Sequence, residues 1–209
     1  MSRLLEKTLI MLVGPSCIGK STIMNEVVRL DERFSRVRSF TTRSPRTNDE
    51  PGHYFYLTAD ELEVKQANGE VISSVMFPTS GQTYGTLTSS YTSEYCLLDT
   101  LANSVEVYRN LPFANTIAVS VTTSAELWQK WFTGRYPKPS DEATKRLEEA
   151  RLSINWSLKD TKTLWLVNRD SPKESATNLL QIIESGTATR DAAANVHAML
   201  ELIDRGMWT

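Results

Sequence analysis

The stretch that decides the fold is Gly14-Pro15-Ser16-Cys17-Ile18-Gly19-Lys20-Ser21-Thr22, which fits the phosphate-binding loop pattern G-x-x-x-x-G-K-[ST] at every fixed position. A short, continuously apolar run precedes it, Thr8–Val13, and is typical of a buried parallel strand. Apolar residues at helical spacing follow it from Ser21 to Leu30 and predict a helix. Because strand, loop and helix occur in the order that the motif requires, we prefer this interpretation to a chance glycine-rich turn.

In such a loop, successive backbone N–H groups turn inward to make an anion cradle, and the helix N-terminus adds partial positive charge. Gly14 and Gly19 permit dihedrals and a close approach that a Cβ would block. Lys20 can reach the terminal phosphates as a point charge, and the Ser21 hydroxyl can ligate Mg²⁺. We therefore expect the loop to bind the phosphates of a nucleotide; its residues are Gly14, Pro15, Ser16, Cys17, Ile18, Gly19, Lys20, Ser21 and Thr22.

Size and composition exclude several classes of protein. A chain of 209 residues fits one core domain with insertions, and a net charge of −2 gives no basic field for nucleic acid or membrane surfaces. No stretch approaches the roughly 18 apolar residues of a membrane span, and the polar start is no signal peptide. Two distant cysteines indicate a reducing, cytoplasmic setting. Cys17 is either a reactive thiol beside the loop amides or a small side chain that fills the loop.

A second anion site is predicted between Ser39 and Arg46, because Arg43 and Arg46 lie three apart around a proline and arginine presents a planar fork to phosphate oxygens. The interval 39–86 forms a small insertion with strand patterns, and its segment Gln82–Thr86 is polar. An apolar strand then ends in Asp99, which we expect beside the phosphate loop, holding Mg²⁺. A solvated basic loop and a strand that merely ends in aspartate are the alternatives.

The rest of the chain alternates strands and helices, so we expect an α/β fold with a mainly parallel sheet flanked by helices. The remaining predicted elements are strands at Thr116–Val121 and Thr163–Asn168, helices at Ser124–Phe132, around 147–158 and at Glu174–Ser185, and turns at Thr133–Ser140.

The tail predicts one more helix, because Val196, Met199, Leu200 and Ile203 share one helical face. That face either packs on the core, which we favour, or forms a homodimer contact.

Four blocks together resemble the guanylate kinase family, over about Thr8 to Ser185. These are Gly14-Pro15-Ser16-x-x-Gly19-Lys20-Ser21-Thr22, Ser39-Phe40-Thr41-Thr42-Arg43-Ser44-Pro45-Arg46, Tyr84-Gly85-Thr86 and Leu97-Leu98-Asp99. The second and third blocks make the resemblance specific. It implies a P-loop NTPase fold with a small strand-rich NMP-binding insertion and a lid. The core would comprise 1–38, 87–132 and 150–186, the NMP-binding region 39–86, the lid 133–149, and the C-terminal helix 187–209.

The resemblance also implies a reaction: ATP, with Mg²⁺, donates its γ-phosphoryl group to a nucleoside monophosphate beneath a closing lid. The implied catalytic residues are Lys20, Arg43, Arg135 and Arg146. Ser21 and Asp99 would hold the metal, Asn168 would lie near the ATP base, and Lys130 would lie near a third lid cation. The acceptor would be bound by Ser39, Arg43, Arg46, Tyr54, Ser73, Tyr84, Thr86 and Asp99.

Three positions depart from the family pattern. Cys17 stands where the family usually has glycine, Ser73 where it has glutamate, and Leu101 where it has a second aspartate. A carboxylate accepts from both N1–H and N2–H of guanine, and a serine hydroxyl does not match that charged two-point contact. We therefore hypothesise that the substrates are GMP, dGMP or a broadened set of (d)NMPs.

Two alternatives from other classes stay open. One is a catalytically silent guanylate-kinase-like module that binds proteins, although the retained lysine and arginines argue against it. The other is a kinase for another phosphorylated metabolite, which Ser73 keeps open. The expected partners are small-molecule nucleotides, with a homodimer as a further option.

Overall fold

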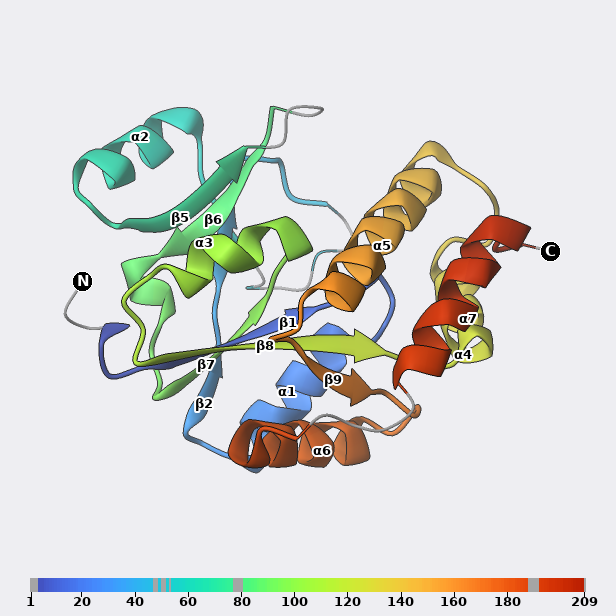
Figure 1. Ribbon diagram of the computed structural model, residues 1–209. Coiled ribbons are helices and arrows are strands. Elements are labelled where there is room, and N and C mark those ends of the chain that lie inside the picture. Colours follow the sequence, from blue (N-terminus) through green and yellow to red (C-terminus); the bar gives the residue numbers. More distant parts are fainter. Residues whose placement is uncertain are drawn as a thin grey trace.

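The computed structural model describes residues 4–46, 49, 52, 54–76, 81–187 and 192–208, and strands and helices alternate along it (Figure 1). The described residues form two sheets: a main sheet of five strands in the order β2-β7-β1-β8-β9, and a second sheet in the order β4-β3-β6-β5. Every neighbouring pair in the main sheet is parallel. Its strands are β1 (Thr8–Val13), β2 (Phe34–Arg36), β7 (Tyr95–Asp99), β8 (Asn115–Thr122) and β9 (Leu164–Val167). The predicted α/β fold is confirmed.

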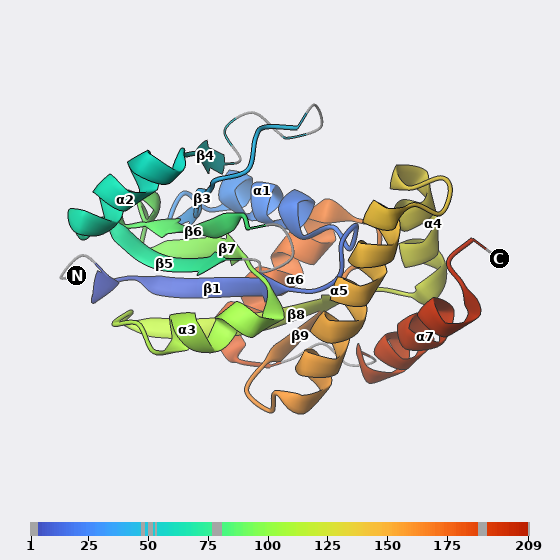
Figure 2. The same ribbon diagram turned by 90° about the horizontal axis from the view of Figure 1, so that it is seen from above.

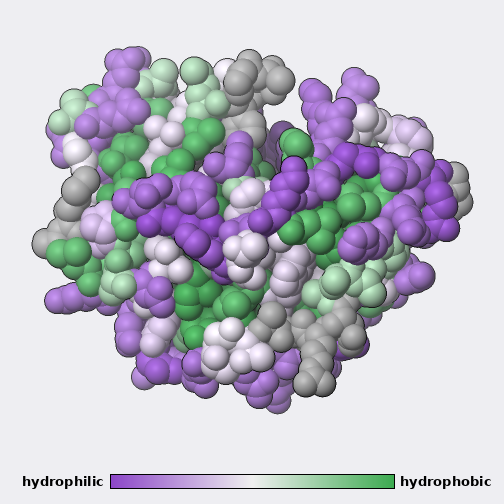
Figure 3. Space-filling view, viewed as in Figure 1, coloured by the Kyte–Doolittle hydropathy of each residue, from purple (hydrophilic) through white to green (hydrophobic). Residues whose placement is uncertain are grey.

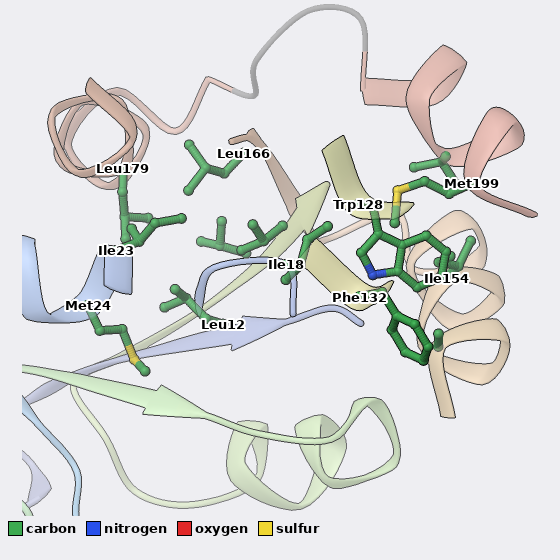
Figure 4. Close-up of a cluster of buried hydrophobic side chains, with 14 of the residues drawn as sticks. Leu12, Ile18, Ile23, Met24, Trp128, Phe132, Ile154, Leu166, Leu179 and Met199 are labelled. Atoms are coloured by element: carbon green, nitrogen blue, oxygen red, sulfur yellow. The ribbon is translucent and has the colours of Figure 1, made fainter. Parts of the chain in front are cut away.

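Both faces of the main sheet are buried, which is why its strands read as continuous apolar runs. Alternate side chains of β1 point to opposite faces: Ile10 and Leu12 join the larger apolar cluster, and Leu9 and Met11 join a second cluster. Figure 4 shows the larger cluster, in which helices pack against the sheet beside the β1–α1 loop. The helices around the sheet are α1 (Lys20–Leu30), α3 (Val105–Arg109), α4 (Ala125–Arg135), α5 (Asp141–Lys159), α6 (Pro172–Ser185) and α7 (Ala192–Arg205).

The second sheet lies at one end of the molecule together with α2 (Ala59–Ala67), as the view from above shows (Figure 2). Its strands are β3 (Ser39–Thr41), β4 (Tyr54–Tyr56), β5 (Val71–Met76) and β6 (Thr83–Leu87), and short 3₁₀ turns follow β6 (Thr88–Ser90) and precede α3 (Ala102–Ser104). Helix α2 begins with a reciprocal capping box between Thr58 and Glu61. This sheet is the predicted strand-rich insertion.

Some predicted boundaries are wrong. Strand β2 was not expected, because three residues are too few for a periodic signal, and β6 was expected only as a polar segment. Helix α4 runs through Gly134 to Arg135 and does not end at Phe132, so Arg135 lies in its last turn. The proposed boundary between lid and core at residue 149 falls inside the single helix α5. The division into core, NMP-binding region and lid stays a prediction.

The C-terminal helix packs on the chain's own core, as favoured. Val196, Met199 and Leu202 are at most 5% exposed, and α7 lies against α4 and α5. Beyond it, the Trp208 indole Nε1 donates to the Tyr136 carbonyl at 2.9 Å, just after α4. The apolar face of α7 is therefore covered within the chain, and the homodimer stays a prediction. Within the described ranges, no helix is both long enough and apolar enough to cross a bilayer.

Candidate active site

The phosphate loop connects β1 to α1 and contains three residues with positive φ, which are Gly14 with φ 151°, Cys17 with φ 65° and Gly19 with φ 92°. A Cβ added to Gly19 would lie 2.4 Å from Asn168 Nδ2, so the loop tolerates no side chain there. Cys17 keeps the backbone conformation that favours glycine, at a cost of roughly 1–2 kcal/mol for a residue with a Cβ. Cys17 therefore adopts the backbone conformation that a glycine would have at this position, and the loop keeps its shape.

Two buried side chains hold the loop from behind. Asn168 Nδ2 donates to the Ile18 carbonyl at 3.0 Å, and Asn168 Oδ1 accepts from Ser175 Oγ at 2.9 Å. The Trp128 indole Nε1 donates to the Ser16 carbonyl at 2.9 Å. These bonds leave the loop N–H groups for an anion. Because both ends of the Asn168 amide bind protein atoms, the structure places this residue behind the phosphate loop.

Lys20 lies at the start of α1 and bends back over the loop. Its Nζ donates to the carbonyls of Gly14 and Pro15 at 2.7 and 3.0 Å and lies 3.7 Å from Asp99 Oδ1. The parallel register of β1 and β7 pairs Leu12 with Asp99, which brings the carboxylate to the loop. Asp99 therefore lies where the sequence predicted it.

Oxygen donors at this edge suit a hard divalent cation. Ser21 begins α1 beside Lys20, and the half-exposed Asp99 carboxylate faces the same region. In the described part of the chain, no cluster of three His, Cys, Asp or Glu side chains could hold a metal. This set fits Mg²⁺, which usually takes one or two protein ligands and completes its shell with water and substrate phosphates.

The second predicted anion site is built around Arg43, which is 7% exposed. Its Nη1 and Nη2 donate to the two Asp49 carboxylate oxygens, each at 2.7 Å. The same carboxylate accepts from Tyr56 Oη at 2.5 Å and from the Arg46 backbone N–H at 2.8 Å. Hydrogen bonds from Arg43 hold the pKa of Asp49 well below its usual range. Asp49 thereby fixes the arginine and the loop that carries both cations.

The contacts of Arg43 leave one edge of its guanidinium for a ligand. Nη1 uses its second hydrogen on the Ser44 carbonyl at 2.9 Å. Of the five N–H donors, Nε–H and one Nη2–H have no partner among the described residues. These two form the side edge of the fork, which suits two phosphate oxygens. Burial raises the pKa of nearby Tyr54 to about 12, so its hydroxyl stays a proton donor at neutral pH.

The two anion sites open into one cavity of about 990 Å³. In the space-filling view a hollow separates the part with α2 and β5 from the part with α5 (Figure 3). Arg46 Nη1 reaches Glu142 Oε1 of α5 at 3.2 Å, which links the second sheet to the predicted lid helix. The predicted residues that line the cavity are Gly14, Pro15, Ser16, Lys20, Ser39, Arg43, Arg46, Tyr54, Ser73, Tyr84, Asp99 and Arg146.

Other predicted residues lie around the cavity without lining it. Within the described chain these are Cys17, Ile18, Gly19, Ser21, Thr22, Thr86, Lys130, Arg135 and Asn168. Burial raises the pKa of the Cys17 thiol, and the nearby charges of Arg135, Lys20 and Arg146 oppose this only in part. A raised pKa argues against a reactive thiolate and for the space-filling role of Cys17.

Several lining residues were missed from the sequence. Lys145 lines the cavity next to Arg146, whereas Lys130 is exposed on α4. Lys145 stands directly before the predicted Arg146 in the sequence, and this position was a signal that could have identified it. Tyr108 and Trp156 also line the cavity, from α3 and α5. Only the fold brings these two aromatics together, so the sequence carried no signal for them.

Comparison with known proteins identifies the family. A family model described as guanylate kinase matches residues 6–185, which is most of the chain. The chain belongs to the guanylate kinase family.

Individual relatives agree with this membership. The guanylate kinase of Streptomyces coelicolor is 30% identical over 153 residues, which are 70% of this chain and 76% of that protein. The guanylate kinase of Fusobacterium nucleatum is 29% identical over 180 residues, 83% of this chain and 94% of that protein. The crystal structure of guanylate kinase from Anaplasma phagocytophilum has a TM-score of 0.58 at 17% identity over 88% of this chain and 87% of that chain, which shows a shared fold.

This guanylate kinase family member departs from the family pattern at two positions beside the cavity. Ser73 lines the cavity and is 8% exposed, and its hydroxyl contacts another side chain. Leu101 lines the cavity as well, 37% exposed, and brings an apolar side chain where the pattern has an acid.

Proposed function

We propose that this protein transfers the γ-phosphoryl group of ATP to a nucleoside monophosphate and that its choice of base is relaxed or changed from guanine. Membership of the guanylate kinase family makes it a nucleoside monophosphate kinase, a phosphotransferase. The observation that carries the proposal is the single cavity lined by Gly14 and Lys20 on one side and by Arg43 and Arg46 on the other. Two anion cradles that share one cavity suit a donor and an acceptor phosphate.

The chemistry needs positioning and fixed positive charge, because phosphoryl transfer has a loose transition state with charge spread over the equatorial oxygens. Lys20 would steady the donor phosphates, and Arg43, Arg46, Tyr54 and Tyr84 would bind the acceptor phosphate. Mg²⁺, when bound, bridges phosphate oxygens and neutralises developing charge.

The predicted lid would exclude water, since water would otherwise compete as the acceptor. Arg146 lies on α5 and lines the cavity, where it pairs with Glu149 at 2.7 Å. Arg135 lies at the end of α4, close to Cys17 of the phosphate loop. Both arginines therefore start close to the donor site, and a small movement of the α4–α5 segment would bring their charge onto the transferring group.

The test is a panel of ribo- and deoxyribonucleoside monophosphates incubated with ATP and Mg²⁺, with diphosphate products separated by ion-exchange chromatography. We expect at least one monophosphate to be converted and Lys20→Ala to abolish conversion while the melting temperature stays close to wild type. Absence of any diphosphate product would refute the kinase proposal. A preference for guanine over every other base by several orders of magnitude would refute the altered base choice.

Binding separates the proposal from its alternatives. A ligand that binds only the folded state stabilises it by mass action and so raises the melting temperature. The gain in unfolding free energy is about 2.7 kcal/mol when the ligand concentration is a hundred times Kd. ATP and a monophosphate should each produce a shift. A protein-binding module without catalysis would show neither shift, and a kinase for another metabolite would respond to ATP but to no nucleoside monophosphate.

A further inference from the structure

Four hydroxyl groups form a chain that reaches the cavity lining. Tyr91 Oη donates to Thr86 Oγ1 at 2.8 Å, Thr86 Oγ1 lies 3.5 Å from Tyr108 Oη, and Ser73 Oγ donates to Tyr108 Oη at 2.7 Å. Thr86 and Tyr91 are at most 5% exposed, and Ser73 and Tyr108 line the cavity. The chain therefore runs from the interior to the cavity wall.

Counting protons shows what this wall offers to a ligand. Four hydroxyls carry four protons, and three contacts join them, so one proton is left over. With Tyr91 and Thr86 donating outward along the chain and Ser73 donating to Tyr108, the spare proton lies on Tyr108. Burial raises the pKa of Tyr108, so this hydroxyl stays protonated. The cavity wall thus presents a neutral O–H donor.

The carboxylates that line the cavity, by contrast, pair with its cations. Among the described lining residues the acids are Asp99, Glu142 and Glu149, and each lies within 4.0 Å of a cation of the phosphate-binding side. The lining also contains the apolar side chains of Val75, Leu101 and Trp156 and the neutral polar side chains of Gln82, Asn103 and Ser104. Among the described lining residues, an exocyclic amino group would therefore find no carboxylate other than those paired with cations, whereas a carbonyl oxygen would find the Tyr108 hydroxyl as a donor.

We infer that the acceptor is a nucleoside monophosphate whose base carries carbonyl oxygens and no exocyclic amino group, which means thymine or uracil. One carbonyl binds the Tyr108–Ser73 hydroxyl pair, and the apolar walls contact the rest of the ring. Guanine, adenine and cytosine each carry an amino group that would have no charged acceptor among the described lining residues other than carboxylates already paired with cations. This inference rests on the proposed kinase function and names the substrate class of the same site.

The test measures kcat/KM for dTMP, dUMP, dCMP, dAMP and dGMP with saturating ATP and Mg²⁺. We expect dTMP and dUMP to exceed dGMP by about tenfold or more, the ratio that one mismatched polar group produces. Tyr108→Phe should lower the dTMP to dGMP ratio about tenfold, through a higher KM for dTMP. Tyr95→Phe is the matched control: Tyr95 begins the strand that ends at Asp99 and does not line the cavity, so the ratio should not change.

A second variant keeps the inference testable if Tyr108→Phe does not fold. Leu101→Asp places an acceptor at a 37% exposed position and should raise kcat/KM for dGMP relative to dTMP about tenfold. A wild-type preference for dGMP, equal use of all bases, or an unchanged ratio in both variants would overturn the inference. Absence of turnover with every monophosphate would instead refute the kinase function itself, so the two failures are distinguishable.

Discussion

Replacing Asp49 by asparagine tests whether the carboxylate prepares Arg43 for the acceptor phosphate. The carboxylate accepts four hydrogen bonds, two of them from the Arg43 guanidinium, whose side chain is 6% exposed. Asparagine has almost the same shape, but it offers one oxygen and turns an N–H₂ group toward the other donors. The substitution therefore removes the charge of the partner with little change in packing.

The expected loss of stability follows from these contacts. Hydrogen bonds to charged groups contribute roughly 1.5–3 kcal/mol each, and removal of one partner of a buried ion pair costs roughly 3–5 kcal/mol. Because asparagine keeps one acceptor, we expect Asp49→Asn to lower the free energy of unfolding by about 3 kcal/mol. In a protein of this size about 1 kcal/mol corresponds to roughly 2–4 °C, so the melting temperature should fall by about 6–12 °C.

The kinetic effect distinguishes a positioning role from a merely structural one. A guanidinium that is no longer held would bind the acceptor phosphate less well, so KM for the best monophosphate should rise about tenfold or more, and KM for ATP should stay unchanged. Asp31→Asn is the control, because Asp31 binds Arg33 in the same two-point manner, but Arg33 is 53% exposed. That variant should lose at most about 1 kcal/mol and keep both KM values.

An unchanged acceptor KM in a folded Asp49→Asn protein would refute the reasoning, since Arg43 would then act without the carboxylate. The pH dependence gives an independent check. Arg43 lowers the pKa of Asp49, so the carboxylate stabilises the fold fully above its ordinary pKa near about 4 and progressively less as pH falls through the lower folded-state pKa. The difference in melting temperature between wild type and Asp49→Asn should therefore be constant from about pH 5 to 8 and shrink below about pH 4.

Two further predictions concern the walls of the cavity. Asn168→Ala leaves the Ile18 carbonyl and the Ser175 hydroxyl without their buried partner. We therefore expect denaturant melts to show a loss of about 2–4 kcal/mol in unfolding free energy and initial rates to show a higher KM for ATP. An unchanged KM for ATP would contradict the role of Asn168 in holding the loop. Glu142→Gln removes an exposed negative charge beside Arg46, so the free energy of unfolding should change by less than about 1 kcal/mol. KM for the monophosphate should fall at low salt and return toward the wild-type value at high salt. A KM that does not respond to salt would contradict an electrostatic cause.

Much of this site could be predicted because its chemistry is local in sequence. The phosphate loop, the strand before it and the helix after it are contiguous, and the arginines Arg43 and Arg46 stand three residues apart. Asp99 was placed correctly because the carboxyl ends of parallel strands meet at one edge of a sheet. Each of these features is fixed by a spacing that a single sequence shows.

What could not be predicted depends on contacts between distant segments. Tyr108 reaches Ser73 across 35 residues, and no periodicity announces that pair. Asn168 was expected near the ATP base, and its bond to the carbonyl of Ile18, 150 residues away in the sequence, had no signal in the sequence. The role of Asn168 toward ATP stays a prediction, because a residue can hold the loop and still influence the nucleotide beyond it.

Among the described residues the cavity is lined by more cations than acids, and several of these cations bind groups of the chain itself. Lys20 donates to carbonyls of its own loop, Arg46 pairs with Glu142 of α5, and Arg43 pairs with Asp49. Arg46 and Glu142 are both half-exposed, so an arriving phosphate can replace Glu142 at small cost, since exposed ion pairs contribute only about 0–1 kcal/mol. Asp49 differs, because it binds Nη1 and Nη2 of Arg43 and leaves the side edge, formed by Nε–H and the second Nη2–H, for the ligand. Substrate binding would therefore exchange the outer contacts and keep the inner one, and for this reason Asp49→Asn and Glu142→Gln should change the acceptor KM in opposite directions.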